Sequence, residues 1–324
     1  MPMIRALYTA VKAEGVPSPF DTLHLKVFYP AAPTGNDAER MTGVVPADRS
    51  CGPMPVVIFF GGINIPAECY AWLAVALARQ RIVTALFNWV GETLPGAIGL
   101  TIGLDLKRVT PQTYGCGPTV PAIGQIIAAL DALNCSGPLE GALAPDRLIL
   151  GGHSAGGTAA LHNANPRYFA RVVAGFSYAG HTLAATMLGF APGTVLPCSP
   201  ELPLLLMGGA RDGVIAASAV RYGQAADPVL PLRCTFEEGI AGQRGDRYLA
   251  IWHGANHFTL AHPLDETSGR SFLDLPAQGD EAVTRAHISE VVAAFILAVA
   301  SRNHSAPAQL ELLLNNPAVA WRKK

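Results

Sequence analysis

The sequence predicts an α/β protein with a mostly parallel central sheet and helices on both faces. Short apolar runs rich in β-branched and aromatic residues recur along the chain, as in PVVIFF at 55–60, and such runs are typical of strands buried on both faces. Segments with apolar residues at helical spacing lie between them. This repeated strand–helix–strand order favours parallel strands joined by crossover helices.

The elements follow in chain order. Imperfect alternation of polar and apolar residues predicts two strands, at 4–11 and 22–29. A Pro-, Gly- and Asp-rich stretch at 31–55 is predicted to be a loop. The later strands are predicted at 55–60, 81–89, 147–151, 171–178, 202–210 and 247–255. The helices are predicted from Pro66, whose ring suits a first helical turn, and at 118–133, 154–163, 214–222 and 281–300.

Composition predicts a single domain over 1–324, with 301–324 as an appendage. Half of the 324 residues are hydrophobic, which is enough for a large core. The formal net charge is −1, so no strong field attracts nucleic acid or an anionic membrane. No apolar run exceeds about ten residues, too few to span a bilayer. The start of the chain lacks the pattern of a signal peptide, so we expect a cytoplasmic protein, or a secreted one if a signal has been removed.

Six cysteines, at 51, 69, 116, 135, 198 and 234, are scattered without C-x-x-C spacing. We therefore expect no metal site and predict buried, reduced thiols. In a secreted protein the even number would permit disulfides. The oligomeric state is left open.

One serine lies between glycines where a predicted strand meets a predicted helix. GHSAG, 152–156, matches the pattern G-x-S-x-G. A sharp turn there holds the Ser154 hydroxyl clear of the sheet, and only glycine fits at 152 and 156, where strand and helix nearly collide. The alternative is a tight structural turn. Ser177 lies in a similar stretch that lacks the second glycine and a following helix, so we interpret it as structural.

A serine nucleophile needs a histidine base and an acid that orients the base. In folds with this turn the chain order is serine, acid, histidine. Asp212 follows the predicted strand 202–210 and is the candidate acid, with capping of the next helix as the alternative. His257 is the candidate base, because it lies in a turn just past the strand 247–255, with a solvated loop histidine as the alternative. His253 is predicted to belong to that strand.

The oxyanion of such a reaction needs two backbone N–H donors. Ala155 supplies one at the start of the helix, and Ile63, in FFGGIN after the strand 55–60, supplies the other. An ordinary glycine turn is the alternative for the second segment. Gly62, His153 and Trp89 are further candidates for substrate contact, although His153 is also expected to pack against the sheet.

Three motifs, GGHSAGG, GGARDG and GANHF, together resemble the α/β-hydrolase superfamily over about residues 22–300. PVVIFFGGI and GHSAGG are most similar to the branch that holds chlorophyllases, dienelactone-hydrolase-like proteins and bacterial polyester hydrolases. The chain departs from these groups by having a serine rather than a cysteine nucleophile, Ala155 rather than arginine, and Ile63 rather than an aromatic residue.

The resemblance implies an α/β-hydrolase fold and a serine esterase that forms an acyl-enzyme without metal or organic cofactor. Chlorophyllase-like activity is one version. The alternatives are a polyester, cutinase-like or lipase-type hydrolase, an acyltransferase, thioesterase or peptidase on the same fold, or a binding protein that has lost catalysis. A dinucleotide site is disfavoured because G-x-G-x-x-G is absent here.

The connection 88–118 is long and apolar, which predicts a lid or pocket wall. A short extra helix that completes the core is the alternative. The segments 239–246 and 263–279 are candidates for the other sides of the pocket. We therefore expect an ester with an apolar part.

Overall fold

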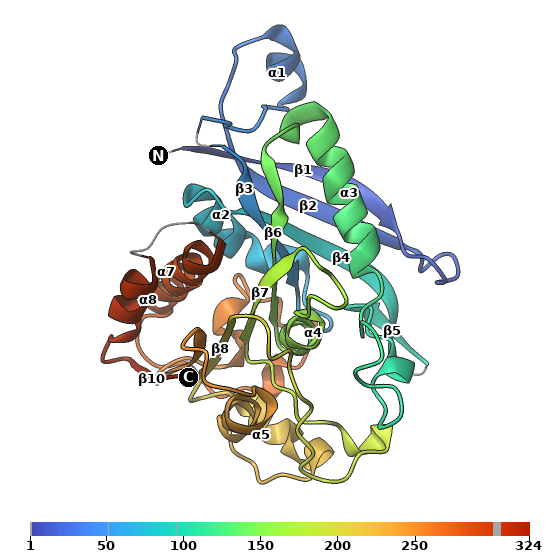
Figure 1. The fold of residues 1–324 in the computed structure, drawn as a ribbon, viewed down its shortest axis with the longest axis vertical. Helices are drawn as coiled ribbons and strands as arrows, with labels where there is room; N and C mark the ends of the chain where they lie inside the picture. Colours follow the sequence, from blue (N-terminus) through green and yellow to red (C-terminus); the bar gives the residue numbers. More distant parts are fainter. Residues whose placement is uncertain (1, 51, 95, 301–305) are drawn as a thin grey trace.

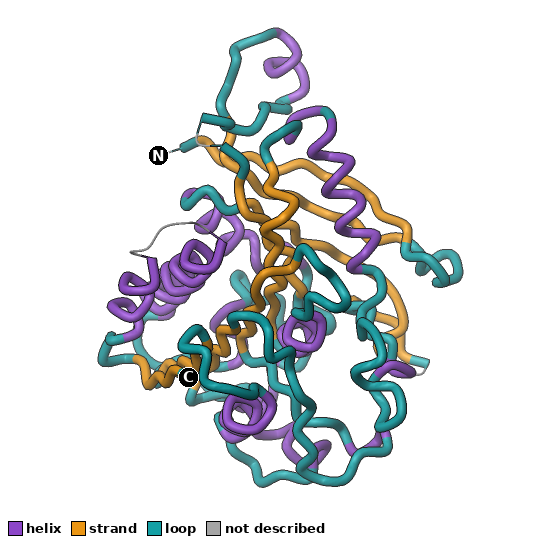
Figure 2. Tube along the Cα trace, viewed as in Figure 1, coloured by secondary structure: helices purple, strands orange, loops and turns teal. Residues whose placement is uncertain are grey.

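The computed structural model describes residues 2–50, 52–94, 96–300 and 306–324. Figure 2 shows the strands as one continuous twisted band through the middle of the molecule. In spatial order they are β1 (Met3–Lys12), β2 (Thr22–Ala31), β4 (Val83–Leu94), β3 (Met54–Phe60), β6 (Leu143–His153), β7 (Val172–Tyr178), β8 (Leu204–Gly209), β9 (Arg247–Trp252) and β10 (Val319–Lys323).

The sheet is parallel from β4 through β3, β6, β7 and β8 to β9. Antiparallel pairing joins β1, β2 and β4 at one edge, β10 to β9 at the other, and β4 to β5 (Ala97–Leu100) in a hairpin. Every residue of β3, β8 and β9 is buried. This matches the continuous apolar runs from which these strands were predicted.

Helices cover both faces of the sheet, as the sequence predicted. The main ones are α2 (Ala71–Arg79), α3 (Ile123–Cys135), α4 (Ala155–Asn163), α5 (Gly213–Ser218), α7 (Glu281–Ala300) and α8 (Ala306–Leu314). In Figure 1, α2, α7 and α8 lie on one side of the sheet, and α3 and α4 lie on the other. Contacts join α7 to both α2 and α8, while α4 packs on β6 and β7.

By length and composition, α7 is the one helix of the described residues that could cross a membrane. Its composition has another explanation here, because the helix packs against α2 and β7. Phe295 and Ile296 are fully buried, and a helix that is apolar nearly all round is typical of a protein core.

Several expectations need correction. The predicted loop 31–55 contains a short helix, α1 (Asp37–Thr42), capped by the Asn36 side chain. Two short elements after α5 were not predicted: α6 (Leu230–Cys234) and a π-helical turn (Thr235–Gly239). The segment 301–324, expected as an appendage, supplies the edge strand β10, while 301–305 lie outside the described residues. The segment 319–323 is a strand because it pairs with β9. A sequence of five residues does not reveal such a distant pairing partner.

The cysteines are less uniformly buried than predicted. Cys69 and Cys198 are buried, Cys234 is half-buried, and Cys116 and Cys135 are exposed. These five are free thiols, and Cys51 lies outside the described residues.

Candidate active site

The serine turn has the strained geometry that G-x-S-x-G predicts. Ser154 joins β6 to α4 with φ 57° and ψ −127°, a conformation that costs a non-glycine residue about 1–3 kcal/mol. Its backbone N–H donates to the Tyr178 carbonyl at the end of β7, and its carbonyl accepts from Thr158 in α4. The strain is therefore held by the strand and the helix together.

The two flanking glycines are required by close backbone approach. A Cβ at Gly152 would collide with the carbonyl of Gly156, the second residue of α4. A Cβ at Gly156 would collide with the carbonyls of Phe60 and Gly61, at the end of β3. The motif thus packs the serine turn directly against the loop that carries Ile63.

Replacement of Gly156 by alanine is expected to destabilise the protein by about 1–3 kcal/mol or more, because overpacking must move backbone. It is also expected to abolish the ester hydrolysis that the sequence predicts. Gly124→Ala is the matched control, since a Cβ there meets open space in α3 and alanine favours a helix by about 1 kcal/mol. Urea unfolding and ester turnover measure both effects. Equal stability of the two variants would contradict the steric argument.

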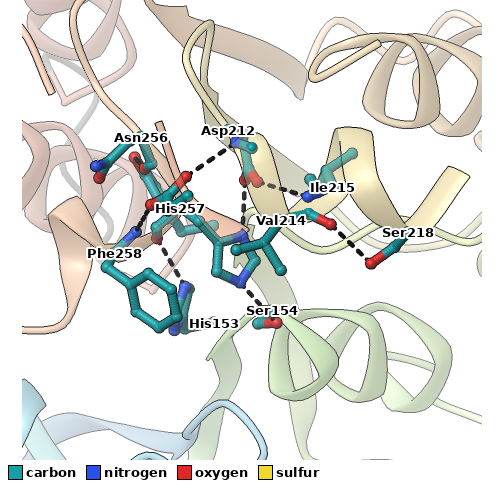
Figure 3. A network of polar contacts seen from close by, with 12 residues as sticks. His153, Ser154, Asp212, Val214, Ile215, Ser218, Asn256, His257 and Phe258 are labelled. Carbon is teal, nitrogen blue, oxygen red and sulfur yellow. Dashed lines mark hydrogen bonds and ion pairs between the residues drawn. The ribbon is translucent and has the colours of Figure 1, made fainter. Parts of the chain in front are cut away.

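Ser154, His257 and Asp212 form one chain of hydrogen bonds (Figure 3). The Ser154 Oγ lies 2.9 Å from His257 Nε2, and His257 Nδ1 lies 2.7 Å from Asp212 Oδ2. With Nδ1–H donating to the carboxylate, Nε2 is left free to accept the serine proton. Both His257 and Asp212 are buried.

Asp212 makes both of the contacts that the sequence presented as alternatives, one to the histidine and one to the next helix. Besides its bond to His257, it accepts the Ile215 N–H through Oδ1, at 2.7 Å, and so caps α5. The cap holds the carboxylate in place without occupying the oxygen that faces the histidine. Gly209 allows the acid loop to approach, because a Cβ there would collide with the Ala255 carbonyl, two residues before His257.

Of the three neighbouring histidines, the structure brings His257 to the serine. It begins a short 3₁₀ helix, His257–Leu260. His253 is exposed and lies just past the end of β9, rather than within the strand as expected. Its backbone N–H donates to Ala318, beside β10. His262 is exposed.

The expected oxyanion donors flank the serine. Ile63 and Ala155 both line the cavity that contains Ser154. Among the described residues, neither backbone N–H has an acceptor, and Ala155 is the first residue of α4, where the helix dipole favours negative charge. The Gly62 N–H, by contrast, donates to the Tyr70 hydroxyl.

This cavity has a volume of about 210 Å³ and mostly apolar walls. Its aliphatic walls come from four segments, and they are Ile63, Leu104, Val109, Leu183, Leu188, Leu196, Val214 and Ile215. Leu104 and Val109 belong to the predicted lid or pocket wall 88–118, so part of that segment borders the cavity. The first part of the segment 88–118 forms the hairpin of β4 with β5 rather than a wall of this cavity.

Comparison with known proteins supports the architecture. No family model matches the chain, and no curated protein sequence matches it. Among solved structures, it is similar to a ferulic acid esterase from Streptomyces cinnamoneus, with a TM-score of 0.57 and 15% identity over 99% of this chain and 96% of that one. The chain has the α/β-hydrolase fold. At this identity the likeness establishes the fold alone.

Within this α/β-hydrolase fold, His153 lies beneath the site rather than in the cavity. It is fully buried, and its Nε2 lies 2.9 Å from the His257 carbonyl. A carbonyl can only accept, so Nε2 carries the proton and Nδ1 accepts from the Tyr70 hydroxyl, at 2.8 Å. Burial lowers the pKa of His153 well below its usual value, which keeps the ring neutral. Tyr70 in turn accepts from Gly62.

This chain of bonds connects the loop of Ile63 to the backbone of His257. His153 thus links the two loops, and contrary to expectation it does not line the cavity that contains Ser154. Gly62 does not line the cavity either. Trp89 is buried, donates its Nε1–H to the Phe20 carbonyl, and lines another cavity, of about 600 Å³, away from the serine. The smaller cavity is the relevant one because it contains Ser154 and His257.

Sequence reasoning missed Asp274, which bridges the loops of the acid and the base. Its Oδ1 accepts from the Gly213 N–H at 2.9 Å, and its Oδ2 accepts from the Phe258 N–H at 3.1 Å. Burial, followed by the nearby Asp212 charge, raises the pKa of Asp274. The residue lies in the predicted pocket-forming segment 263–279, but no motif there marks it.

Loss of this bridge is expected to reduce catalysis without removing a reacting group. Asp274→Ala should lower kcat about 10- to 100-fold, because small displacements of catalytic groups are costly, with little change in KM. Asp274→Asn retains one acceptor oxygen, so its kcat should lie between those of wild type and Asp274→Ala. Asp265→Ala is the control, because that carboxylate bonds only locally, to Thr267 and Ser268. An unchanged kcat in Asp274→Ala would show that the bridge does not position the site.

Among the described residues, no cluster of three or more His, Cys, Asp or Glu side chains is placed to hold a metal ion.

Proposed function

We propose that this protein is a serine hydrolase that cleaves carboxylic esters with an apolar part. The observation that carries the proposal is the continuous chain from the Ser154 hydroxyl through His257 to the buried Asp212. The α/β-hydrolase fold and the similarity to an esterase structure support it. The apolar cavity beside the serine supports an apolar substrate group.

The reaction follows from the placement of each group. His257 Nε2 takes the Ser154 proton as Oγ bonds to the ester carbonyl carbon, and the N–H groups of Ile63 and Ala155 stabilise the oxyanion. The alcohol leaves with the proton that His257 holds, and the acyl group stays on Ser154. Water then gives a proton to His257 and attacks the acyl carbon, and the acid departs as the proton returns to Ser154. Asp212 stays ionised and orients the imidazole throughout.

Cavity size bears on the finer alternatives. At about 210 Å³, the cavity is smaller than the 300–1,000 Å³ usual for sites that enclose a drug-sized ligand. This favours a compact acyl group over a long lipid chain. Chlorophyllase-like, polyester-hydrolase and lipase-type activities are all compatible with the proposal, because their substrates differ in groups that can lie outside the cavity. Acyl transfer and thioester cleavage would use the same residues.

The test is a substrate panel combined with an active-site probe. We expect a fluorophosphonate to label wild type and p-nitrophenyl esters of short acyl chains to be hydrolysed faster than those of long chains. Rates on matched thioesters, on amides and on a ferulic acid ester then identify the class of bond that the protein cleaves. If the probe fails to label and no ester is cleaved, the protein is a binding protein that kept the fold.

A further inference from the structure

Within the described structure, one buried histidine that lines the Ser154 cavity has no hydrogen-bond partner for its ring nitrogens. His162 is 8% exposed, and within the described structure neither ring nitrogen has a hydrogen-bond partner. Burying an unsatisfied polar group destabilises a protein, and such groups are rare enough to need an explanation. Part of the ring lines the cavity that contains Ser154. Both nitrogens are covered by protein in this conformation, so the ring must turn for a bound molecule to form a hydrogen bond with either one.

Helix geometry places His162 at the far end of this cavity. Ala155, Thr158, Ala159 and His162 all line it, and their spacing puts them on one face of α4. His162 comes eight positions after Ser154, a rise of about 12 Å at 1.5 Å per residue. The cavity therefore extends along two turns of α4, from the nucleophile to the histidine.

Apolar groups enclose the inner part of the cavity. A small cluster of Val109, Ala184 and Leu196 packs with Leu104 and Leu188 there, and these residues also line the cavity. The Tyr114 ring meets the His162 ring edge-on at 5.1 Å, while its hydroxyl donates elsewhere, to the Pro197 carbonyl. An acyl group that fills this space needs an apolar body and a polar tip.

The charge state of His162 defines that tip. Burial lowers its pKa to about 4, so the ring is neutral at neutral pH, with one nitrogen donating and the other accepting. A neutral imidazole does not attract an anion by charge. A hydroxyl can both donate to it and accept from it, and it can replace water that would otherwise occupy the site.

We propose that His162 binds a hydroxyl group at the distal end of the acyl part of the substrate. We assign the hydroxyl to the acyl part rather than to the alcohol because the acyl part becomes attached to Ser154, and Ser154 lines the cavity. The pocket would thereby select esters of compact, apolar hydroxy acids, above all hydroxyaryl acids, whose rigid ring carries the hydroxyl to a fixed distance. This inference rests on the proposed ester hydrolysis and adds a specificity-determining residue to it.

The test compares matched acyl groups. Methyl esters of 3- and 4-hydroxycinnamic acid are measured against the corresponding methyl-substituted cinnamates, because CH₃ and OH are similar in size and only OH forms hydrogen bonds. Wild type should prefer one hydroxy isomer by about 10- to 100-fold in kcat/KM, the range expected when buried polar groups are left unpaired. His162→Leu should abolish this preference, and His162→Gln, which keeps a donor and an acceptor, should retain part of it.

Two controls separate this inference from the proposed function. p-Nitrophenyl acetate is too short to reach His162, so its hydrolysis by wild type tests the proposed ester hydrolysis separately from the role of His162. Calorimetric binding of 3- and 4-hydroxycinnamate to Ser154→Ala and to the double variant with His162→Leu gives a readout without turnover, with weaker binding expected in the double variant. Normal acetate hydrolysis with equal wild-type rates on hydroxy and methyl esters would overturn the role of His162 alone. Absence of all ester turnover in wild type would overturn both.

Discussion

Ser154→Ala is expected to lower kcat for ester hydrolysis by about a millionfold, which is the order of loss when a triad serine is removed. In the proposed mechanism, the hydroxyl 2.9 Å from His257 Nε2 bonds to the acyl carbon, and alanine offers no substitute. Stability should change little, because serine and alanine bear the same backbone strain at φ 57°. Fluorophosphonate labelling should be lost together with turnover.

Ser177→Ala is the matched control for that experiment. Ser177 lies in the near-match GFSYA, is buried, and has an Oγ without a hydrogen-bond partner in the described structure. Its replacement should leave kcat and labelling at wild-type values. If Ser154→Ala cleaved esters normally, another residue would be the nucleophile and the proposed mechanism would be wrong.

Asp212→Asn should reduce kcat by about 10⁴-fold, the loss seen when an amide replaces a triad carboxylate and the histidine adopts the wrong tautomer. The amide cannot both accept from His257 Nδ1–H and stabilise the imidazolium that forms during the reaction. Asparagine is as good an N-cap as aspartate, so it can still accept the Ile215 N–H that Asp212 Oδ1 accepts now. We therefore expect lost activity with a nearly unchanged free energy of unfolding.

Two further variants isolate this effect. Asp227 likewise accepts backbone N–H groups at the start of a helix, those of Val229 and Leu230 beside α6. It lies outside the site, so Asp227→Asn should be fully active. Asp212→Ala loses the cap as well and should be both inactive and about 1 kcal/mol less stable. Activity in Asp212→Asn within tenfold of wild type would rule out this carboxylate as the orienting acid.

The sequence alone predicted those elements whose formation depends on neighbouring residues in the chain. Continuous apolar runs predicted the buried strands β3 and β8, and the structure confirms the α/β fold that follows from them. Steric exclusion predicted Gly152 and Gly156, since the collision it avoids lies within one turn and the next loop. The order of Ser154, Asp212 and His257 predicted the triad, and the structure brings the three together, while their catalytic roles remain predictions.

The tertiary structure alone decided the contacts between segments far apart in the chain. Asp274 bridges two loops, at Gly213 and Phe258, that no sequence pattern relates to it. His153 faces inward to Tyr70 and His257 because the β3 loop and the histidine loop close over it. In the described structure the ring nitrogens of His162 lack hydrogen-bond partners, and the Tyr114 ring packs against the imidazole from a distant loop. Periodicity and motif report which face of an element is buried, but the partner on that face is set by packing of the whole chain.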